Sequence, residues 1–84
     1  MSYEVILRRT AEKEFGRLPA KLHQRITEKL LSLECEPRPF GVQKLHGHDG
    51  YRVRVGDWRI LYLIDDQKQI VEVIAIGNRR NVYR

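Results

Sequence analysis

The chain has 84 residues, enough for one domain and one hydrophobic core but not for a separate regulatory domain. Its formal net charge of +5 favours an anionic partner such as nucleic acid, a membrane surface or an acidic protein, although ordinary solubility charge is the alternative. The only cysteine, Cys35, excludes an internal disulfide and a cysteine-based metal site. Because no signal peptide and no run of ~20 apolar residues is present, we expect a single cytoplasmic domain over residues 1–84 without membrane contact.

The first half of the chain predicts one strand followed by a helical hairpin. Residues 3–7 form a short β-type run, and the Thr10 hydroxyl is suited to cap a following helix. Pro19 separates this helix from a second one, predicted over residues 20–35, near whose end Cys35 is expected to serve as a small packing residue. The apolar residues recur at helical spacing: Ala11, Phe15 and Leu18 in the first helix, and Leu22, Ile26, Leu30 and Leu33 in the second.

The second half of the chain predicts a loop and three strands. Prolines and glycine mark a loop over residues 37–41, and β-type runs follow at residues 51–55, 58–64 and 69–76. The last run is almost entirely apolar, which is typical of a central strand, and Gly77 is expected to end it. The order β-α-α-β-β-β predicts an α+β domain in which the helical hairpin packs on one face of a small, mainly antiparallel sheet.

Gly56-Asp57 sets the register of a predicted hairpin. A two-residue loop with glycine first suits a type II′ turn, so residue 55 pairs with 58, 54 with 59, 53 with 60, 52 with 61 and 51 with 62. Since side chains alternate between faces, Arg52, Arg54 and Arg59 project from one face. The other face is apolar and can pack on the helices; it carries Tyr51, Val53, Val55, Trp58, Ile60 and Tyr62.

The shared arginine face predicts a phosphate-binding surface. Arg54 directly opposite Arg59 is an unfavourable pairing that a bound polyanion would offset, whereas arginines that merely coat a solvent face are the alternative. The end of the chain adds basic and aromatic groups that suit RNA, namely Arg79, Arg80, Tyr83 and Arg84. For Tyr83, base stacking and a hydrophobic plug that holds the chain end are both open.

Three segments together resemble the RelE branch of the RelE/ParE toxin superfamily. They are Lys-Leu-His-Gly at residues 44–47, Tyr-Arg-Val-Arg-Val-Gly-Asp-Trp-Arg at 51–59, and Ile-Gly-Asn-Arg-Arg-Asn-Val-Tyr at 76–83. The similarity runs from about Tyr3 to the end of the chain, and the element order is that of the family. The resemblance implies a toxin that enters the ribosomal A site and cuts mRNA there, without a metal or another cofactor.

The resemblance also assigns roles to individual residues. The residues that it places in the catalytic site are Arg52, Arg54, Arg59, Arg79 and Tyr83, and the further RNA-binding candidates are Lys44, His46, Arg80 and Arg84. Well-studied relatives carry lysines at the strand pair that is arginine here, and arginine is a poor general base because it holds its proton more firmly than lysine. Val82 leaves no terminal histidine before Tyr83, and His46 and His48 are more simply interpreted as exposed loop residues.

The implied reaction is attack of an mRNA 2′-OH on the adjacent phosphate. Arg59 and Arg79 would stabilise charge on that phosphate, Arg52 and Arg54 would hold the backbone, and Tyr83 would orient the 2′-OH or stack on a base. Without a strong base the rate must come from positioning, so naked RNA should be a poor substrate.

The resemblance implies partners as well as a reaction. The expected partners are a cognate antitoxin that wraps the toxin, the ribosome with its mRNA, and operator DNA bound through the antitoxin. Three alternatives to an active nuclease remain: a ParE-like inhibitor of DNA gyrase, a nucleic-acid-binding module without catalysis, and an inactive relative. Growth arrest on expression would separate an active toxin from the last two.

Overall fold

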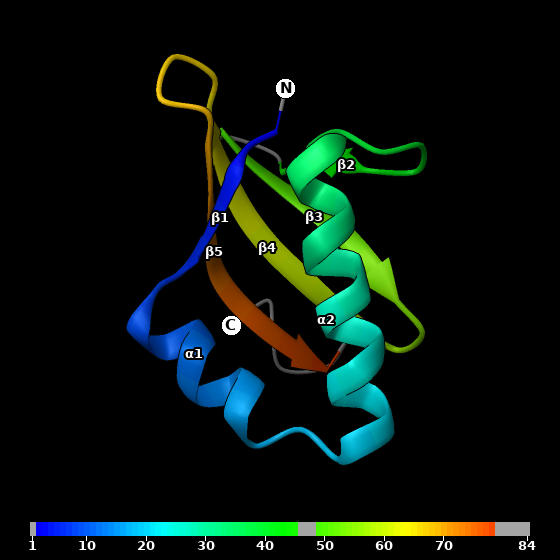
Figure 1. Cartoon of the computed structure of the whole chain (residues 1–84). Coiled ribbons are helices and arrows are strands. Elements are labelled where there is room, and N and C mark those ends of the chain that lie inside the picture. Colours follow the sequence, from blue (N-terminus) through cyan, green and yellow to red (C-terminus); the bar gives the residue numbers. More distant parts are fainter. Residues whose placement is uncertain (1, 46–48, 79–84) are drawn as a thin grey trace.

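Two helices and five strands make up the fold. The computed structural model describes residues 2–45 and 49–78, and Figure 1 shows the arrangement of its elements. In chain order these are β1 (Glu4–Leu7), α1 (Arg9–Gly16), α2 (Ala20–Cys35), β2 (Gln43–Lys44), β3 (Gly50–Val55), β4 (Trp58–Asp65) and β5 (Ile70–Asn78). The predicted α+β class is confirmed. The two-residue strand β2 was not predicted, because a strand this short has no detectable alternation.

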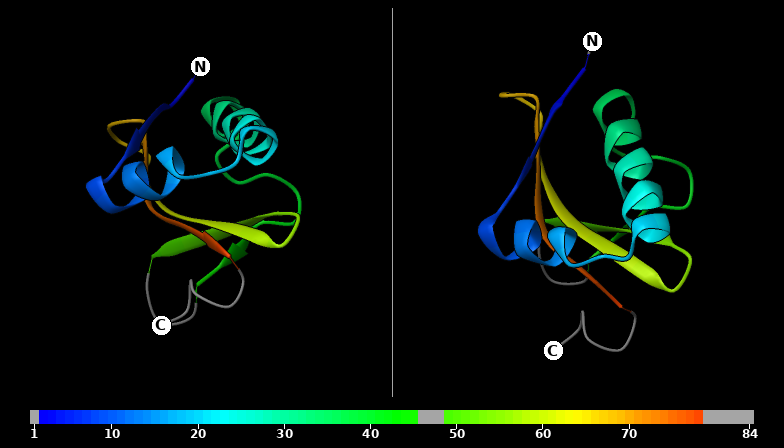
Figure 2. Two further views of the ribbon diagram at one scale, coloured as in Figure 1. Left: turned by 90° about the horizontal axis from the view of Figure 1, so that it is seen from below. Right: turned by 60° about the horizontal axis from the view of Figure 1, so that its bottom comes forward.

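The strands form one sheet in the order β1-β5-β4-β3-β2. Neighbouring strands are antiparallel except β1 and β5, which are parallel. Figure 2 shows α1 and α2 on the same side of the sheet, so neither of the two described helices covers the opposite face. The prediction of a central last strand is confirmed, because β5 lies between β1 and β4.

The two helices differ in how well the sequence predicts their starts. Helix α2 spans Ala20–Cys35 as predicted and follows Pro19. Helix α1 begins at Arg9, its N-cap is Arg8 and no side chain caps it, so the predicted cap at Thr10 is wrong. The reason is the sheet: the Arg8 amide donates to Val73 in β5, and the Arg8 carbonyl accepts from Glu12, so strand pairing fixes where the helix starts. Thr10 therefore lies inside the first turn.

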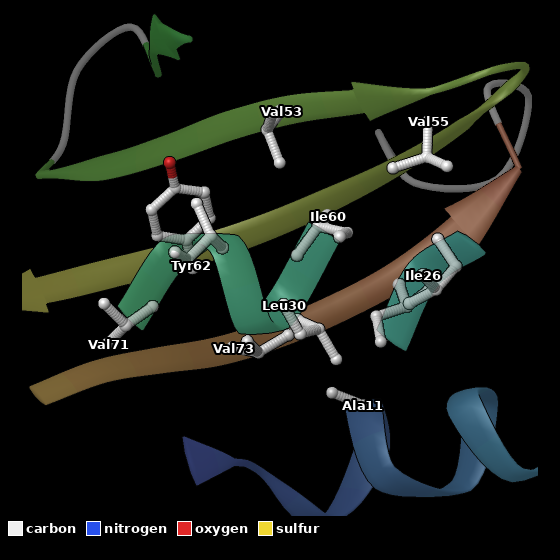
Figure 3. Packing of buried hydrophobic residues seen from close by; sticks show 11 residues of the cluster. Ala11, Ile26, Leu30, Val53, Val55, Ile60, Tyr62, Val71 and Val73 are labelled. Atoms are coloured by element: carbon white, nitrogen blue, oxygen red, sulfur yellow. The ribbon is translucent and has the colours of Figure 1, made fainter. Parts of the chain in front are cut away.

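The hydrophobic core fills the layer between the helices and the covered face of the sheet. Figure 3 shows the apolar side chains of β3, β4 and β5 pointing into the same layer as those of both helices. The buried members are Ala11, Ile26, Leu30, Leu33, Val53, Val55, Ile60, Tyr62, Val71, Val73 and Ile76. Every apolar residue placed on the helix side by the predicted register either belongs to this cluster or packs against it.

Tyr62 is the largest fully buried side chain of the core. Its hydroxyl donates a 2.8 Å hydrogen bond to the backbone carbonyl of Pro37, so the ring connects β4 to the loop that follows α2. Burial raises the pKa of Tyr62 above its ordinary value, because the phenolate would lose its hydration. Tyr62 therefore acts as a neutral donor that pins this loop to the sheet.

The β3–β4 hairpin has the predicted register. Val55 pairs with Trp58, Arg54 with Arg59 and so on to Tyr51 with Tyr62, as the two-residue loop requires. Gly56 has φ +60°, while Asp57 is not among the residues with positive φ. Positive φ at the first loop residue alone is the signature of the predicted type II′ turn.

Two other local expectations were wrong, and one irregularity of the sheet was not predicted. Cys35 is exposed rather than packed, because it follows the last buried residue of α2, Leu33. Gly77 does not end the last strand, since β5 continues to Asn78, which pairs with Trp58. The register between β4 and β5 also shifts by one residue, so that Leu61 pairs with Ala75 but Tyr62 pairs with Val73. A continuously apolar run contains no alternation from which such a bulge could be predicted.

Candidate nucleic-acid interface

Arg52, Arg54 and Arg59 lie on the open face of the sheet, opposite the helices. The residues between and beside them, Val53, Val55 and Ile60, point into the core, and alternation turns the arginines the other way. Arg54 is directly opposite Arg59, and Arg52 is opposite Leu61. The predicted convergence of the three arginines on one face is confirmed, and their roles in binding or catalysis stay predictions. We call this surface the arginine face.

The three arginines differ in exposure. Arg54 is exposed and Arg52 is half-buried, but only 6% of Arg59 is accessible. Arg59 lies on a strand with a neighbour on each side, between Arg54 of β3 and Gly77 of β5, whereas β3 is nearer the sheet edge. Arg52 and Arg59 both interact with other parts of the chain. The central place of β4 in the sheet explains why Arg59 is less exposed than the other two arginines.

A buried guanidinium is suited to attracting an anion. Arginine keeps its proton even when water is scarce, and the lower effective dielectric strengthens its attraction for an anion. Arg59 is the one charged side chain that is buried among the described residues. The open face therefore presents a buried cation, Arg59, beside a solvent-exposed one, Arg54.

The two residues of strand β2 lie on opposite faces of the sheet, and the RNA-binding role of Lys44 stays a prediction. Lys44 pairs with Tyr51, so it leaves the sheet on the helix side, away from Arg52 and Arg54. Gln43 pairs with Arg52 and shares the arginine face. Its amide can both donate and accept hydrogen bonds, which suits contact with a nucleotide. No sequence pattern selects Gln43, because β2 itself was not predicted.

The remaining site candidates lie outside the described residues. They are His46, Arg79, Arg80, Tyr83 and Arg84, together with His48. The chain reaches Arg79 directly from Asn78, whose strand partner Trp58 is the neighbour of Arg59. The assignments of these residues stay predictions from the sequence.

The far end of the open face has the opposite character. A hollow of about 910 Å³ is lined there by apolar side chains of β1, β4 and β5 and by several carboxylates. Two of these carboxylates are already paired, Glu72 with Arg8 at 2.7 Å and Asp66 with Arg38 at 2.9 Å. In each pair the arginine hydrogen bond lowers the pKa of the carboxyl group. An anion is therefore favoured at the arginine face and disfavoured at this acidic end.

The described part of the chain has neither a cluster of metal-binding side chains nor a membrane-spanning helix. Residues 2–45 and 49–78 contain no group of three or more His, Cys, Asp or Glu side chains placed to hold a metal ion. In the same residues no helix has the length and apolarity that crossing a bilayer requires.

Comparison with known proteins places this architecture in a class. A sequence profile described as the ParE toxin of the type II toxin–antitoxin system parDE matches residues 5–83. The chain is 33% identical over 84 residues to toxin RelE of Mycobacterium tuberculosis. This alignment covers 98% of this chain and 87% of the relative. The fold and these matches define a toxin of a type II toxin–antitoxin system.

Solved structures are similar over nearly the whole chain. A chain of the archaeal RelE–RelB complex from Pyrococcus horikoshii is 31% identical, with a TM-score of 0.84 and coverage of 98% of this chain and 100% of that one. A chain of the intact RelBE toxin–antitoxin complex of Escherichia coli is 28% identical, with a TM-score of 0.82 and coverage of 92% and 96%. The chain belongs to the RelE/ParE toxin family, as a RelE-like member.

Proposed function

We propose that this protein is a ribosome-dependent mRNA endonuclease that stops translation by cutting mRNA in the A site. The observation that carries the proposal is the arginine face, where Arg54 stands directly opposite a buried Arg59 with Arg52 one step away on the same side. Such a pairing of like charges costs the free protein stability, and a polyanion on this face offsets that cost. The RelE-like family membership supports RNA as this polyanion.

The proposed reaction needs no metal. The mRNA 2′-oxygen loses its proton and forms a bond to the adjacent phosphorus, and the bond from phosphorus to the 5′-oxygen breaks. The products are a 2′,3′-cyclic phosphate and a 5′-hydroxyl end, and the leaving oxygen gains a proton. Arg59 stabilises the extra negative charge on the phosphate, while Arg52 and Arg54 hold the backbone. From the sequence, Arg79 adds to this stabilisation and Tyr83 orients the 2′-OH or stacks on a base.

The arginine face supplies no obvious base for this reaction. Among the described residues, the strand partners of the three arginines that are not themselves arginine are Gln43, Leu61 and Gly77, and none of these can accept a proton at neutral pH. The rate must therefore come from alignment and charge stabilisation, which intramolecular attack makes effective. This explains why the ribosome, which holds and shapes the mRNA, is part of the proposed substrate.

A cognate antitoxin is the proposed regulator. The Pyrococcus horikoshii and Escherichia coli neighbours are both components of RelE–RelB complexes. We propose that the antitoxin of this chain covers the arginine face with an acidic segment, since opposite potentials favour association and shield the site. Binding of the complex to operator DNA would then proceed through the antitoxin.

The test is to map mRNA 5′ ends after induction in bacteria. Wild type is compared with Arg59→Ala/Arg79→Ala and with a matched control, Lys13→Ala/Arg17→Ala, which removes the same charge from α1. Cuts within translated frames are expected for wild type and control, are expected to vanish in the double variant, and should require ongoing translation. Cuts that persist in the double variant would refute the role of the arginine face.

A second candidate is inhibition of DNA gyrase. The family profile that matches this chain is described as the ParE toxin, and the resemblance to the RelE/ParE superfamily implies that ParE-like proteins share this fold. The same induction experiment separates the two activities. Growth arrest with intact mRNA, together with loss of DNA supercoiling by purified gyrase, would replace the nuclease by the gyrase inhibitor.

A further inference from the structure

A second row of cations runs along α2. Lys21, Arg25 and Lys29 are four residues apart, so they lie on one side of the helix and rise by roughly 6 Å at each step. Lys21 and Arg25 are exposed, and Lys29 is half-buried. We call these three residues the helix stripe. It lies on the helix side of the sheet, whereas the arginine face lies on the open side.

Nothing in the described part of the chain neutralises the helix stripe. The ion pairs Arg8–Glu72 and Arg38–Asp66 lie elsewhere, and no described residue forms an ion pair with Lys21, Arg25 or Lys29. Glu28 is exposed next to the stripe and forms no such bridge. Like charges four residues apart destabilise a helix, so the stripe costs the free protein stability.

The β3–β4 hairpin brings the helix stripe close to the arginine face. A side chain at Gly56 would place its Cβ 3.4 Å from the Arg25 guanidinium, which shows how closely Arg25 approaches the turn. A hollow of about 280 Å³ lies between α2 and β3, and its lining residues are Arg25, Glu28, Lys29, Ser32 and Val55. Figure 2 shows the hairpin beside α2 in both views.

Only the edge of one strand separates the two basic surfaces. Strand β2 pairs with Tyr51 and Arg52 and ends there, so among the described strands none covers the outer edge of Val53–Val55. Arg54 leaves this edge toward the open side, and Val55 lines the hollow beside the helix stripe. A hairpin with cations on both sides can fit between two RNA segments.

Helix α1 provides an instructive contrast. Arg9, Lys13 and Arg17, the C-cap of α1, have the same four-residue spacing, and with Glu12 and Glu14 they leave this segment with a net charge of +1, as α2 has. However, α1 packs on β1 and β5, far from the hairpin in Figure 1. The same spacing therefore occurs in one helix beside the arginine face and in another away from it.

We propose that the helix stripe binds phosphates of ribosomal RNA and anchors the toxin while the arginine face holds the mRNA. The inference rests on the proposed function. One mRNA strand would have to bend around the β3 edge to reach both surfaces, whereas folded RNA supplies a second backbone on the helix side. A row of cations on a helix positions phosphates without reading sequence. The stripe is a binding surface and touches no reacting atom.

The test measures binding to purified bacterial ribosomes with an empty A site over a range of salt. Lys21→Gln/Arg25→Gln/Lys29→Gln is expected to weaken binding at least tenfold and to reduce the slope of log K against log salt by about 2, since each lost phosphate contact changes the slope by about 0.7. Arg25→Gln alone should reduce it by about 0.7. In ribosome-dependent cleavage the triple variant should raise KM and leave kcat unchanged.

The matched control is Arg9→Gln/Lys13→Gln/Arg17→Gln, which removes the same charge at the same spacing from α1. It should keep most of the wild-type salt slope, and equal weakening by both triple variants would overturn the proposal. Unchanged ribosome binding together with lost antitoxin binding would assign the stripe to an acidic protein instead. A wild-type protein that fails to bind ribosomes would refute the proposed function itself. Normal wild-type binding with a silent triple variant would refute only this inference.

Discussion

The two faces of the sheet use the same strands for different purposes. In β3, Val53 is 5% exposed and packs under the helices, while the next residue, Arg54, is exposed on the open face. In β4, Ile60 is fully buried and its neighbour Arg59 belongs to the arginine face. Adjacent residues therefore separate stability from the proposed activity. This separation can be tested one side chain at a time.

The largest expected effect comes from the covered face. Ile60→Ala should lower the free energy of unfolding by about 2–5 kcal/mol, because it removes buried methyl groups and leaves a cavity. Urea unfolding followed by circular dichroism measures the change. Ile60→Val is the matched control and should cost about 0.5–1.5 kcal/mol. If Ile60→Ala were as stable as wild type, the covered face would not be the core described above.

Tyr62 sharpens the comparison at a polar group on the same face. Tyr62→Phe keeps the ring but leaves the Pro37 carbonyl without its donor, which should cost about 1–3 kcal/mol. The midpoint of thermal unfolding is a convenient measure. Tyr51→Phe is the control, since its ring is only half-buried in the same region. Equal losses in both variants would show that the buried hydrogen bond contributes nothing particular.

Arg54 tests the open face, where stability and function should respond in opposite directions. Arg54→Ala removes a like-charge pairing with Arg59, so stability should stay equal or rise by a few tenths of a kcal/mol. Cleavage should fall by about 10–100-fold, as expected for losing one charge-assisted hydrogen bond of about 1.5–3 kcal/mol. Arg54→Lys, which keeps the charge, should retain more activity. A variant that lost stability and activity together would contradict the separation of the two faces.

The smallest expected effect is at Asp66, at the acidic end of the open face. The hydrogen bonds from Arg38 and then Tyr3 lower the pKa of Asp66 in the folded protein. Its contribution to stability is therefore complete above the unfolded pKa of about 3.9 and is lost as the pH falls through the lower folded value. Asp66→Asn should be slightly less stable than wild type at pH 7. Unfolding midpoints of the two proteins should converge below about pH 4, and a constant difference would argue against this pairing.

The sequence predicted best where local chemistry alone decides the structure. Gly56-Asp57 permits one tight turn, and that turn determines the pairing of Arg54 with Arg59 and the alternation that follows. The apolar spacing of α2 likewise predicted both of its ends. The convergence of all three arginines on one face could therefore be inferred without coordinates, because a hairpin is a short-range structure.

Predictions failed where distant parts of the chain decide. The start of α1 depends on the pairing of Arg8 with Val73, which no local pattern records. Two further features were not predicted in either direction: the burial of Arg59 depends on β5 lying beside β4, and the face on which Lys44 lies depends on a two-residue strand. Each failure concerns a residue whose environment is supplied by a segment far along the chain, so charge and periodicity alone were insufficient.

The parallel pairing of β1 with β5 has a consequence for folding during synthesis. β1 precedes the other described elements in the chain, yet among the described strands its only partner begins at Ile70. The pairing of β1 cannot form until β5 has been synthesised, and such long-range pairing makes folding slow. A nascent chain still lacking β5 has no complete core under its helices. The order of synthesis thus delays the folded toxin until most of its chain has been made.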